Sequence, residues 1–229
     1  MAYGRIQGNA GTTRFVTLTT GNSTSLTAQP SNGNLLIAYI VNNTNANSPL
    51  TVVDGASNPF TLLSTWSVRG TALSCGIYGK IAGAAQGRFV TATWSVACTF
   101  DIGMEEWAGG PATLTGIVDG TAPAGGNNTT GTSSSGSQPS QATTGPHSLG
   151  LSLLAQTAGS AFTGETWNGS SITSGMTVNG NVGLAAYQAN LNGVTPWNPV
   201  FTWTTSHAWC QASVALVEKP PGLWVPSVF

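Results

Sequence analysis

The sequence predicts an all-β protein, an antiparallel sandwich built from two similar halves. Short runs rich in Val, Ile, Thr, Phe and Trp recur along the chain, and clusters of Gly, Asn, Pro and Ser separate them. Charged residues make up only 6% of the 229 residues. The helix-favouring Glu, Lys and Arg are therefore scarce, and long windows lack the i, i+3, i+4 apolar pattern of a helix. These observations favour strands and turns throughout.

The predicted strands follow from apolar runs and from alternation. In the last run, Cys210, Ala212, Val214 and Leu216 share one face, while Gln211 and Ser213 share the other, which is the pattern of a strand with one face in a core. The runs are Arg14–Thr20, Leu35–Val41, Leu50–Val53, Phe60–Val68, Leu73–Ile81, Phe89–Ser95, Thr99–Trp107, Leu149–Gln156, Val182–Ala189, Val200–Thr205 and Trp209–Val217.

An internal repeat with an offset of roughly 110 residues indicates the two halves. Arg88–Trp107 aligns with Pro199–Lys219, and Cys98 falls opposite Cys210. The alternative is that two β segments of biased composition align by chance. We expect one β-sandwich domain over residues 1–219, with halves at roughly 30–120 and 146–219. A long polar crossover at 121–145 joins the halves, and residues 220–229 form a C-terminal docking tail.

Charge and hydropathy exclude several classes of partner. The formal net charge is −1 and the six Lys and Arg residues are scattered, so we expect no nucleic-acid partner. The chain begins without an apolar signal region, and no run reaches the roughly 18 apolar residues that span a bilayer, so we expect a soluble chain with no membrane partner. Cys75, Cys98 and Cys210 form no C-x-x-C pair, and we expect each to be a small buried hydrophobe.

Both ends of the chain are candidate contact segments. We expect Met1–Arg14 to form an extended N-terminal arm in which Arg5 and Arg14 contact neighbouring chains. The tail KPPGLWVPSVF contains three prolines, which exclude a central strand. Its apolar residues would dock either on the core of the same chain or on a partner. The expected anchors are Leu223, Trp224, Val225 and Phe229.

The segment Leu50–Trp66, followed by Tyr78 and by the strand ending at Met104–Gly110, resembles a known β-sandwich family. This family recurs in tailed-phage virion proteins and bacterial surface proteins, with the pattern V-x-D-x-x-G-N-x-aromatic; here Ser57–Asn58 stands where Gly–Asn is usual. The resemblance implies a jelly-roll-like sandwich with a structural or adhesive role. In phages such folds often form homotrimeric capsid decoration (cement) proteins, which bind between capsomers, or parts of tails.

The residues offer no strong catalytic constellation. Adjacent Glu105 and Glu106 would point to opposite faces of a strand, and Asp101 lies roughly 13 Å from Glu105 along it, too far for a glycosidase pair. A cross-strand pair involving Asp54, Asp119 or Glu165 stays open. The segment Asp54–Pro59 predicts a turn, with a weak calcium site as the alternative. We expect no enzyme, no cofactor and no metal site.

The tryptophans separate two functional hypotheses. Trp66, Trp94, Trp107 and Trp203 lie on predicted strands, where we expect core positions. Trp167 and Trp197 lie in predicted loops, where a ring would anchor in a partner or stack on a sugar. The first hypothesis is a virion structural protein, a capsid decoration protein or a tail component that contacts the major capsid protein or neighbouring subunits. The alternative is a receptor- or glycan-binding module that uses Trp167, Trp197, Asn168 and His207.

Overall fold

The computed structural model describes residues 3–8, 13–121, 126–127, 133–137, 139–143, 148–157, 162–168, 170–177, 183–191 and 196–218. These residues form antiparallel strands and their connections, with no helix among them, so the predicted all-β class is confirmed. The strands of the first half are β1 (Gly4–Gly8), β2 (Thr13–Asn22), β3 (Leu35–Asn42), β4 (Thr51–Asp54), β5 (Thr61–Leu62), β6 (Ser67–Arg69), β7 (Leu73–Ile81) and β8 (Val90–Ala108). Those of the second half are β9 (Gly126–Asn127), β10 (Ser133–Ser137), β11 (Ser148–Gln156), β12 (Phe162–Trp167), β13 (Ser170–Ser171), β14 (Thr173–Thr177), β15 (Gly183–Leu191), β16 (Val200–His207) and β17 (Trp209–Leu216).

The first half forms a jelly roll, which we call the first roll. One layer has the strand order β1-β8-β3-β7, with β5 and β6 beside β7. The second layer consists of the first part of β8 between β2 and β4. Because β8 is 19 residues long, it leaves this second layer and continues into the first, where it pairs with β3 and β1. This strand order, in two layers, is that of a jelly roll.

The second half repeats the same strand order and forms the second roll. Its sheets have the orders β9-β17-β11-β15-β14 and β10-β16-β12-β13. The place of β8 is taken by β16 and β17, separated at Ala208. The prediction of two similar halves is therefore confirmed at the level of strands. The alignment of Cys98 with Cys210 is wrong, since Cys98 lies in the core of the first roll and Cys210 lies between the rolls.

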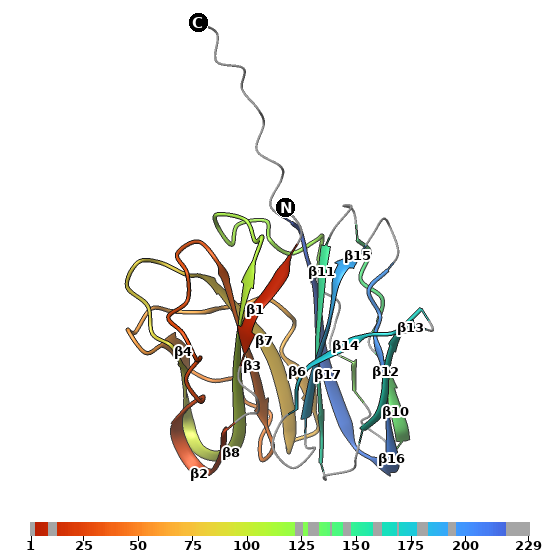
Figure 1. Ribbon diagram of the computed structural model, residues 1–229. Coiled ribbons are helices and arrows are strands. Elements are labelled where there is room, and N and C mark those ends of the chain that lie inside the picture. Colours follow the sequence, from red (N-terminus) through yellow and green to blue (C-terminus); the bar gives the residue numbers. More distant parts are fainter. Residues whose placement is uncertain are drawn as a thin grey trace, which may run out of the picture.

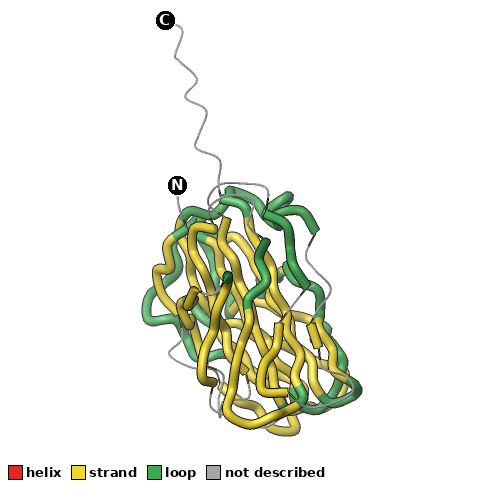
Figure 2. The backbone as a smooth tube through the Cα atoms, turned by 90° about the vertical axis from the view of Figure 1, so that its right-hand side faces the viewer, coloured by secondary structure: helices red, strands yellow, loops and turns green. Residues whose placement is uncertain are grey.

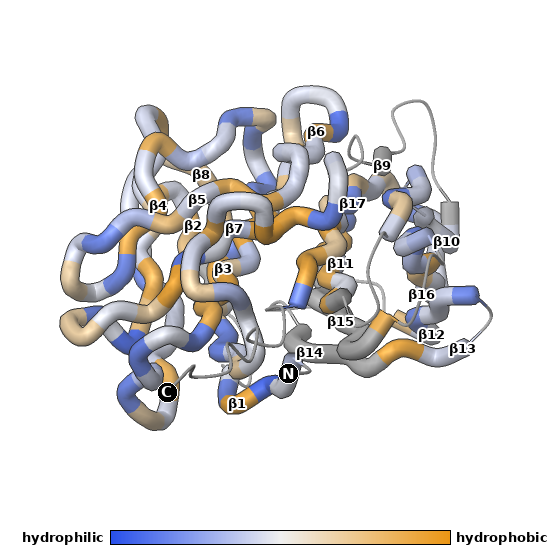
Figure 3. The backbone as a smooth tube through the Cα atoms, turned by 90° about the horizontal axis from the view of Figure 1, so that it is seen from above, coloured by the Kyte–Doolittle hydropathy of each residue, from blue (hydrophilic) through white to orange (hydrophobic). Residues whose placement is uncertain are grey.

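The two rolls stack back to back, so that four layers result (Figure 1). The inner sheets, β1-β8-β3-β7 and β9-β17-β11-β15-β14, face each other across the largest core cluster. Leu35, Ile37 and Tyr39 of β3 belong to this cluster together with Leu151 and Leu153 of β11, and β7 contacts both β11 and β17 across it. Figure 3 shows the apolar segments of β7, β11 and β17 gathered between the halves. We call this cluster the shared core.

Each roll also has its own core between its inner and outer layers. In the first roll, Trp94 and Phe100 lie with ring centroids 4.1 Å apart, and half-buried Trp66 packs against the same core with its ring 6.3 Å from that of Tyr78. Trp107 lies in the shared core and Trp203 in the core of the second roll, so the predicted core positions of these residues are confirmed. The strands run along the long dimension of the body in Figure 2, and loops gather at its ends.

The three cysteines are free and buried, as predicted. Cys75 of β7 and Cys210 of β17 face each other across the shared core, with their Sγ atoms 3.6 Å apart. Burial raises the pKa of the Cys210 thiol well above its usual value, which keeps this group neutral at physiological pH. These thiols pack as small apolar groups.

The sequence does not predict several of the strands, because they carry few apolar residues. The predicted polar crossover at 121–145 contains β9 and β10, and β10 has the sequence SSSGS. β10 forms through backbone pairing with β16, from Ser135 opposite Thr202 to Ser137 opposite Val200. β1 likewise pairs with the end of β8, so the expected N-terminal arm is, from Gly4 onward, a strand of the inner sheet.

The shared core predicts that both rolls unfold together. Leu153 is fully buried there, and Leu153→Ala should lower the free energy of unfolding by about 2–5 kcal/mol. Leu50→Ala is the matched control, because the Leu50 side chain is 68% exposed and its truncation should cost below about 0.5 kcal/mol. Urea unfolding followed by tryptophan fluorescence and by far-UV circular dichroism checks this. Two separate transitions would contradict a shared core.

Candidate interaction surface

Arg5 is tied to its own chain. Its Nε atom lies 2.9 Å from Oε1 of Glu105, a buried carboxylate on β8. Glu105 also accepts hydrogen bonds from the Tyr39 hydroxyl and from Nε1 of Trp107. Burial raises the pKa of Glu105, while Arg5, Tyr39 and Trp107 act in the opposite direction. The Nε atom of Arg5 thus forms an ion pair within the chain, which holds β1 on β8, where the sequence predicted a contact with a neighbouring chain.

The remaining predicted anchors of the two termini are less fully described. Arg14 lies in β2, and its backbone is opposite Asp101 of β8, while its side chain is outside the described part of the chain. The C-terminal anchors Leu223, Trp224, Val225 and Phe229 also lie outside the described residues. The last described residues before this segment are Val217 and Glu218. The carbonyl oxygen of Val217 accepts a hydrogen bond of 2.7 Å from the hydroxyl of Tyr3, beside β1.

Trp197 is a core residue, and its predicted role as a surface anchor is wrong. The side chain is fully buried, and its Nε1 donates to the carbonyl oxygen of Leu151 at 3.0 Å. The ring covers Gly150 so closely that a Cβ atom there would lie 2.7 Å from it. Trp167 is half-buried at the end of β12, 5.8 Å from the Trp197 ring. Its Nε1 donates to the carbonyl oxygen of Pro196, so these two rings form no exposed platform for a sugar.

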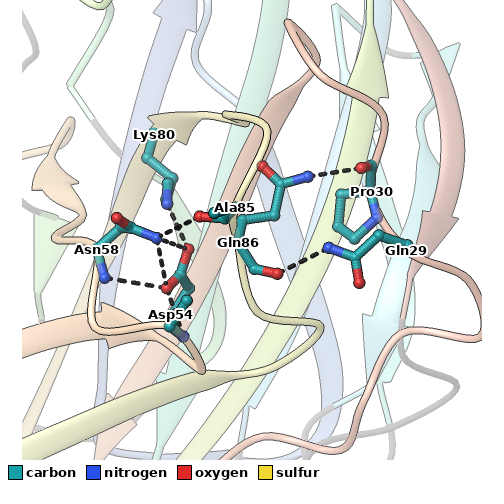
Figure 4. A network of polar contacts seen from close by, with 8 residues as sticks. Gln29, Pro30, Asp54, Asn58, Lys80, Ala85 and Gln86 are labelled. Carbon is teal, nitrogen blue, oxygen red and sulfur yellow. Dashed lines mark hydrogen bonds and ion pairs between the residues drawn. The ribbon is translucent and has the colours of Figure 1, made fainter.

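Asp54 forms the turn that the sequence predicts. Its Oδ1 accepts hydrogen bonds from the backbone amides of Ala56 and Asn58, while Lys80 and the Asn58 side chain contact Oδ2 (Figure 4). The Asn58 amide also donates to the carbonyl oxygen of Ala85, which links the turn to the next loop. Burial opposes ionisation of Asp54, but Lys80 and the hydrogen bonds from Asn58 and Ala56 lower its pKa. The Lys80 ammonium group thus supplies the positive charge beside this carboxylate.

A second polar network lies in the adjoining loop. In Figure 4 the side chain of Gln86 points to the carbonyl oxygen of Pro30, and Gln29 donates to the carbonyl oxygen of Gln86. Glu106 fixes the same loop from β8, since it accepts hydrogen bonds from the backbone amide of Ser31 and from the Asn34 side chain. Glu105 and Glu106 therefore bind partners on opposite faces of β8, as predicted.

Most acidic residues are buried inside the fold. Five of the seven are buried, namely Asp54, Asp101, Glu105, Glu106 and Asp119. In the described part of the chain, no group of three or more His, Cys, Asp and Glu side chains could hold a metal ion. The described residues also include no helix long and apolar enough to cross a bilayer. The exposed side chains of the described residues are consequently mostly those of Ser, Thr and Asn, with isolated apolar groups and few acidic ones.

Three of these apolar groups lie on β2 and β8, near the place where β8 passes between the layers. Val16 and Leu18 of β2 and Val96 of β8 are 64%, 46% and 48% exposed. Leu18 pairs with Cys98, which is two residues from Val96 along β8. Thr17 has a φ of 55°, and the pairing of β2 with β8 is irregular on both sides of Leu18. We call these three residues the β2–β8 corner; the sequence predicts a strand over Val16 and Leu18, leaves Val96 between two predicted strands, and gives no signal that the three side chains are exposed.

Comparison of the chain with protein-family models, with curated proteins and with solved structures finds no match. The functional argument therefore rests on the fold and on the surface described above.

The two best-connected carboxylates predict opposite effects of acid on stability. The lowered pKa of Asp54 gives a stabilisation that is complete above the unfolded value of about 4 and is lost as the pH falls through the folded value. The raised pKa of Glu105 means that protonation of this group favours the folded state. Relative to the unaltered protein, Asp54→Asn should therefore flatten the loss of stability below about pH 5, and Glu105→Gln should steepen it.

Urea midpoints measured between about pH 7 and pH 3 give this comparison. Both variants should be less stable at neutral pH, because each leaves a buried or half-buried cation without its carboxylate, so the slope with pH is the quantity to compare. Parallel curves for the two variants and the unaltered protein would contradict the assignment.

Proposed function

We propose that this protein is a structural protein of a phage virion, a capsid decoration (cement) protein that stabilises the head by binding between capsomers. The observation that carries the proposal is the stacked pair of jelly rolls. Most of their acidic groups are buried, so their surface can contact a partner through shape complementarity and exposed apolar side chains. The resemblance of Leu50–Trp66 to phage virion sandwiches supports the same role. The jelly roll alone hosts many functions, so the surface is the decisive part of the argument.

The fold suits a bridging role between neighbouring capsomers. The shared core makes the two rolls one block, and a block with two outer layers can contact two surfaces at once. Each contact would gain from apolar burial, at about 25 cal/mol per Å² of apolar surface removed from water. By the resemblance, the partners are the major capsid protein and neighbouring copies in a homotrimer, and the location is the capsid surface, or the tail for a tail component.

Binding to particles should depend little on salt. The chain has a net charge of −1, and five acidic groups are buried, so few exposed charges can contribute to attachment. We expect saturable binding to undecorated particles whose apparent dissociation constant changes less than about threefold between about 50 and 500 mM NaCl. Co-sedimentation with particles from the same source measures this. Absence of saturable binding would overturn the proposed function, and a tenfold weakening by salt would overturn the apolar mode of attachment.

Removal of the apolar tail should reduce particle binding without unfolding the protein. Pro220–Phe229 follows the last strand, so its deletion leaves the seventeen described strands intact. We expect an unchanged urea midpoint and at least about tenfold weaker binding, as expected for the loss of several buried apolar side chains. Normal particle binding by the shortened protein would contradict a role of the tail in attachment.

A further inference from the structure

We propose that Lys80 and Asn58 react with each other to form an intramolecular isopeptide bond, with Asp54 as the group that transfers the proton. The bond joins Nζ of Lys80 to Cγ of Asn58 and releases ammonia. It attaches the turn after β4, a strand of the outer layer of the first roll, to β7 in the inner layer. This inference goes beyond the proposed function, because the reaction needs no partner and is measured without particles.

Lys80 holds a nucleophile inside the first roll. It lies on β7, and Tyr78 and Ala82, two residues away on either side, belong to the core of that roll. The Lys80 side chain is only 8% exposed, and its Nζ lies 5.8 Å from the centroid of the Phe60 ring. A lysine amine in such surroundings attacks carbonyl groups once it has lost its proton.

One carboxylate oxygen contacts both reacting groups. Oδ2 of Asp54 lies 2.5 Å from Nζ of Lys80 and 3.0 Å from Nδ2 of Asn58 (Figure 4). The two distances add to 5.5 Å, which is the largest possible separation of the two nitrogens. Nδ2 is bonded to Cγ, the carbon that Nζ attacks. Rotation about the side-chain bonds of Lys80 therefore brings Nζ to the attacking distance of about 3–3.5 Å.

The reaction balances without a co-reactant. Burial opposes ionisation of Asp54, but Lys80 and Asn58 lower its pKa, so its carboxylate accepts a proton from Nζ as a general base. The free electron pair of Nζ then forms a bond to Cγ of Asn58, and the bond between Cγ and Nδ2 breaks. Nζ loses two protons: Oδ2 passes one to Nδ2, which leaves as ammonia, and keeps the other. The first proton transfer is unfavourable for a carboxylate of lowered pKa, so the reaction is slow.

The turn holds the Asn58 amide in place and removes its usual side reaction. The backbone amide of Asn58 donates to Oδ1 of Asp54 at 3.0 Å, and Nδ2 donates to the carbonyl oxygen of Ala85 at 2.9 Å. An asparagine side chain is ordinarily attacked by the backbone nitrogen of the next residue. Here that residue is Pro59, which has no N–H. The amide is thus kept for the Lys80 amine.

The bond changes both charge and stability. It removes the positive charge of Lys80, so the effect of Asp54 on acid stability applies to the chain before this reaction. A covalent link between residues 58 and 80 also restricts the unfolded chain, as a disulfide does. Linked molecules should therefore have a higher urea midpoint than unlinked ones.

Mass spectrometry of the folded protein measures the reaction. During incubation at physiological temperature and neutral pH, a growing fraction of molecules should be lighter by about 17 Da, the mass of ammonia. Trypsin should then release a branched peptide in which Phe15–Arg69 is joined to Gly70–Arg88, because trypsin does not cleave after a modified lysine. This peptide distinguishes the bond from a cyclised Asn–Gly sequence such as Asn32–Gly33, which also loses ammonia.

Two lysine variants form a matched pair. Lys80→Arg keeps a positive charge beside Asp54 but removes the amine, so this variant should fold and keep its full mass at residues 15–88. Lys219→Arg changes the other lysine of the chain and should form the branched peptide like the unaltered protein. Asp54→Asn removes the proton-transfer group and should slow the reaction at least about a hundredfold. Far-UV circular dichroism checks that each variant is folded.

Three results would overturn the inference. The first is an unaltered protein in which residues 15–88 keep their full mass throughout the incubation. The second is a branched peptide that still forms in Lys80→Arg. The third is a loss of about 18 Da, the mass of water, which would join Lys80 to Asp54 in place of Asn58. Particle binding by protein of full mass would leave the proposed function standing while this inference fails.

Discussion

The burial of both faces of the inner sheets is the constraint on which the rest of the structure depends. All eight residues of β3 and all eight of β17 are buried, so these strands contact apolar surroundings on both sides. Neither roll alone could cover Leu35, Ile37 and Tyr39 on the face that meets the other roll. An isolated half would expose this face to water, at a cost of about 25 cal/mol per Å² of apolar surface. The duplicated fold is therefore a single unit, because each half is the cover that the other half requires.

The same constraint explains where the few charges lie. A sheet covered on both faces leaves no solvent on either side of β8 from Cys98 to Trp107, so Glu105 and Glu106 can be accommodated only with fixed partners. Glu105 binds Arg5 of β1, and Glu106 binds the amide of Ser31 and the side chain of Asn34. These carboxylates thus attach the edge strand and a surface loop to the inner sheet. They join elements inside the fold, and few acidic groups remain exposed among the described residues.

The sequence predicted the apolar strands well and the polar ones poorly. The run Leu73–Ile81 coincides with β7, and the alternation from Cys210 to Leu216 marks β17, because side-chain burial determines both. β10 has no apolar side chain and forms through backbone pairing with β16, which leaves no trace in hydropathy. Trp197 lies outside a regular strand, and the sequence predicts an exposed ring there. Backbone hydrogen bonds with Gln141 instead hold this residue in the core. The exposure of Val16, Leu18 and Val96 likewise depends on the change of layer by β8, which periodicity alone does not reveal.

Duplication also allows the two outer layers to differ while the inner ones remain alike. The inner sheets must match each other, since they share one core, and both keep the order in which a central strand lies between two partners: β8-β3-β7 and β17-β11-β15. The outer layers face water and carry no such requirement. In the first roll β8 is continuous, and the apolar residues of the β2–β8 corner are exposed. In the second roll the equivalent strand is interrupted at Ala208, and Ala208 and Trp209 are buried. The shared core therefore fixes the architecture, and the two rolls differ in their outer layers, which that core does not constrain.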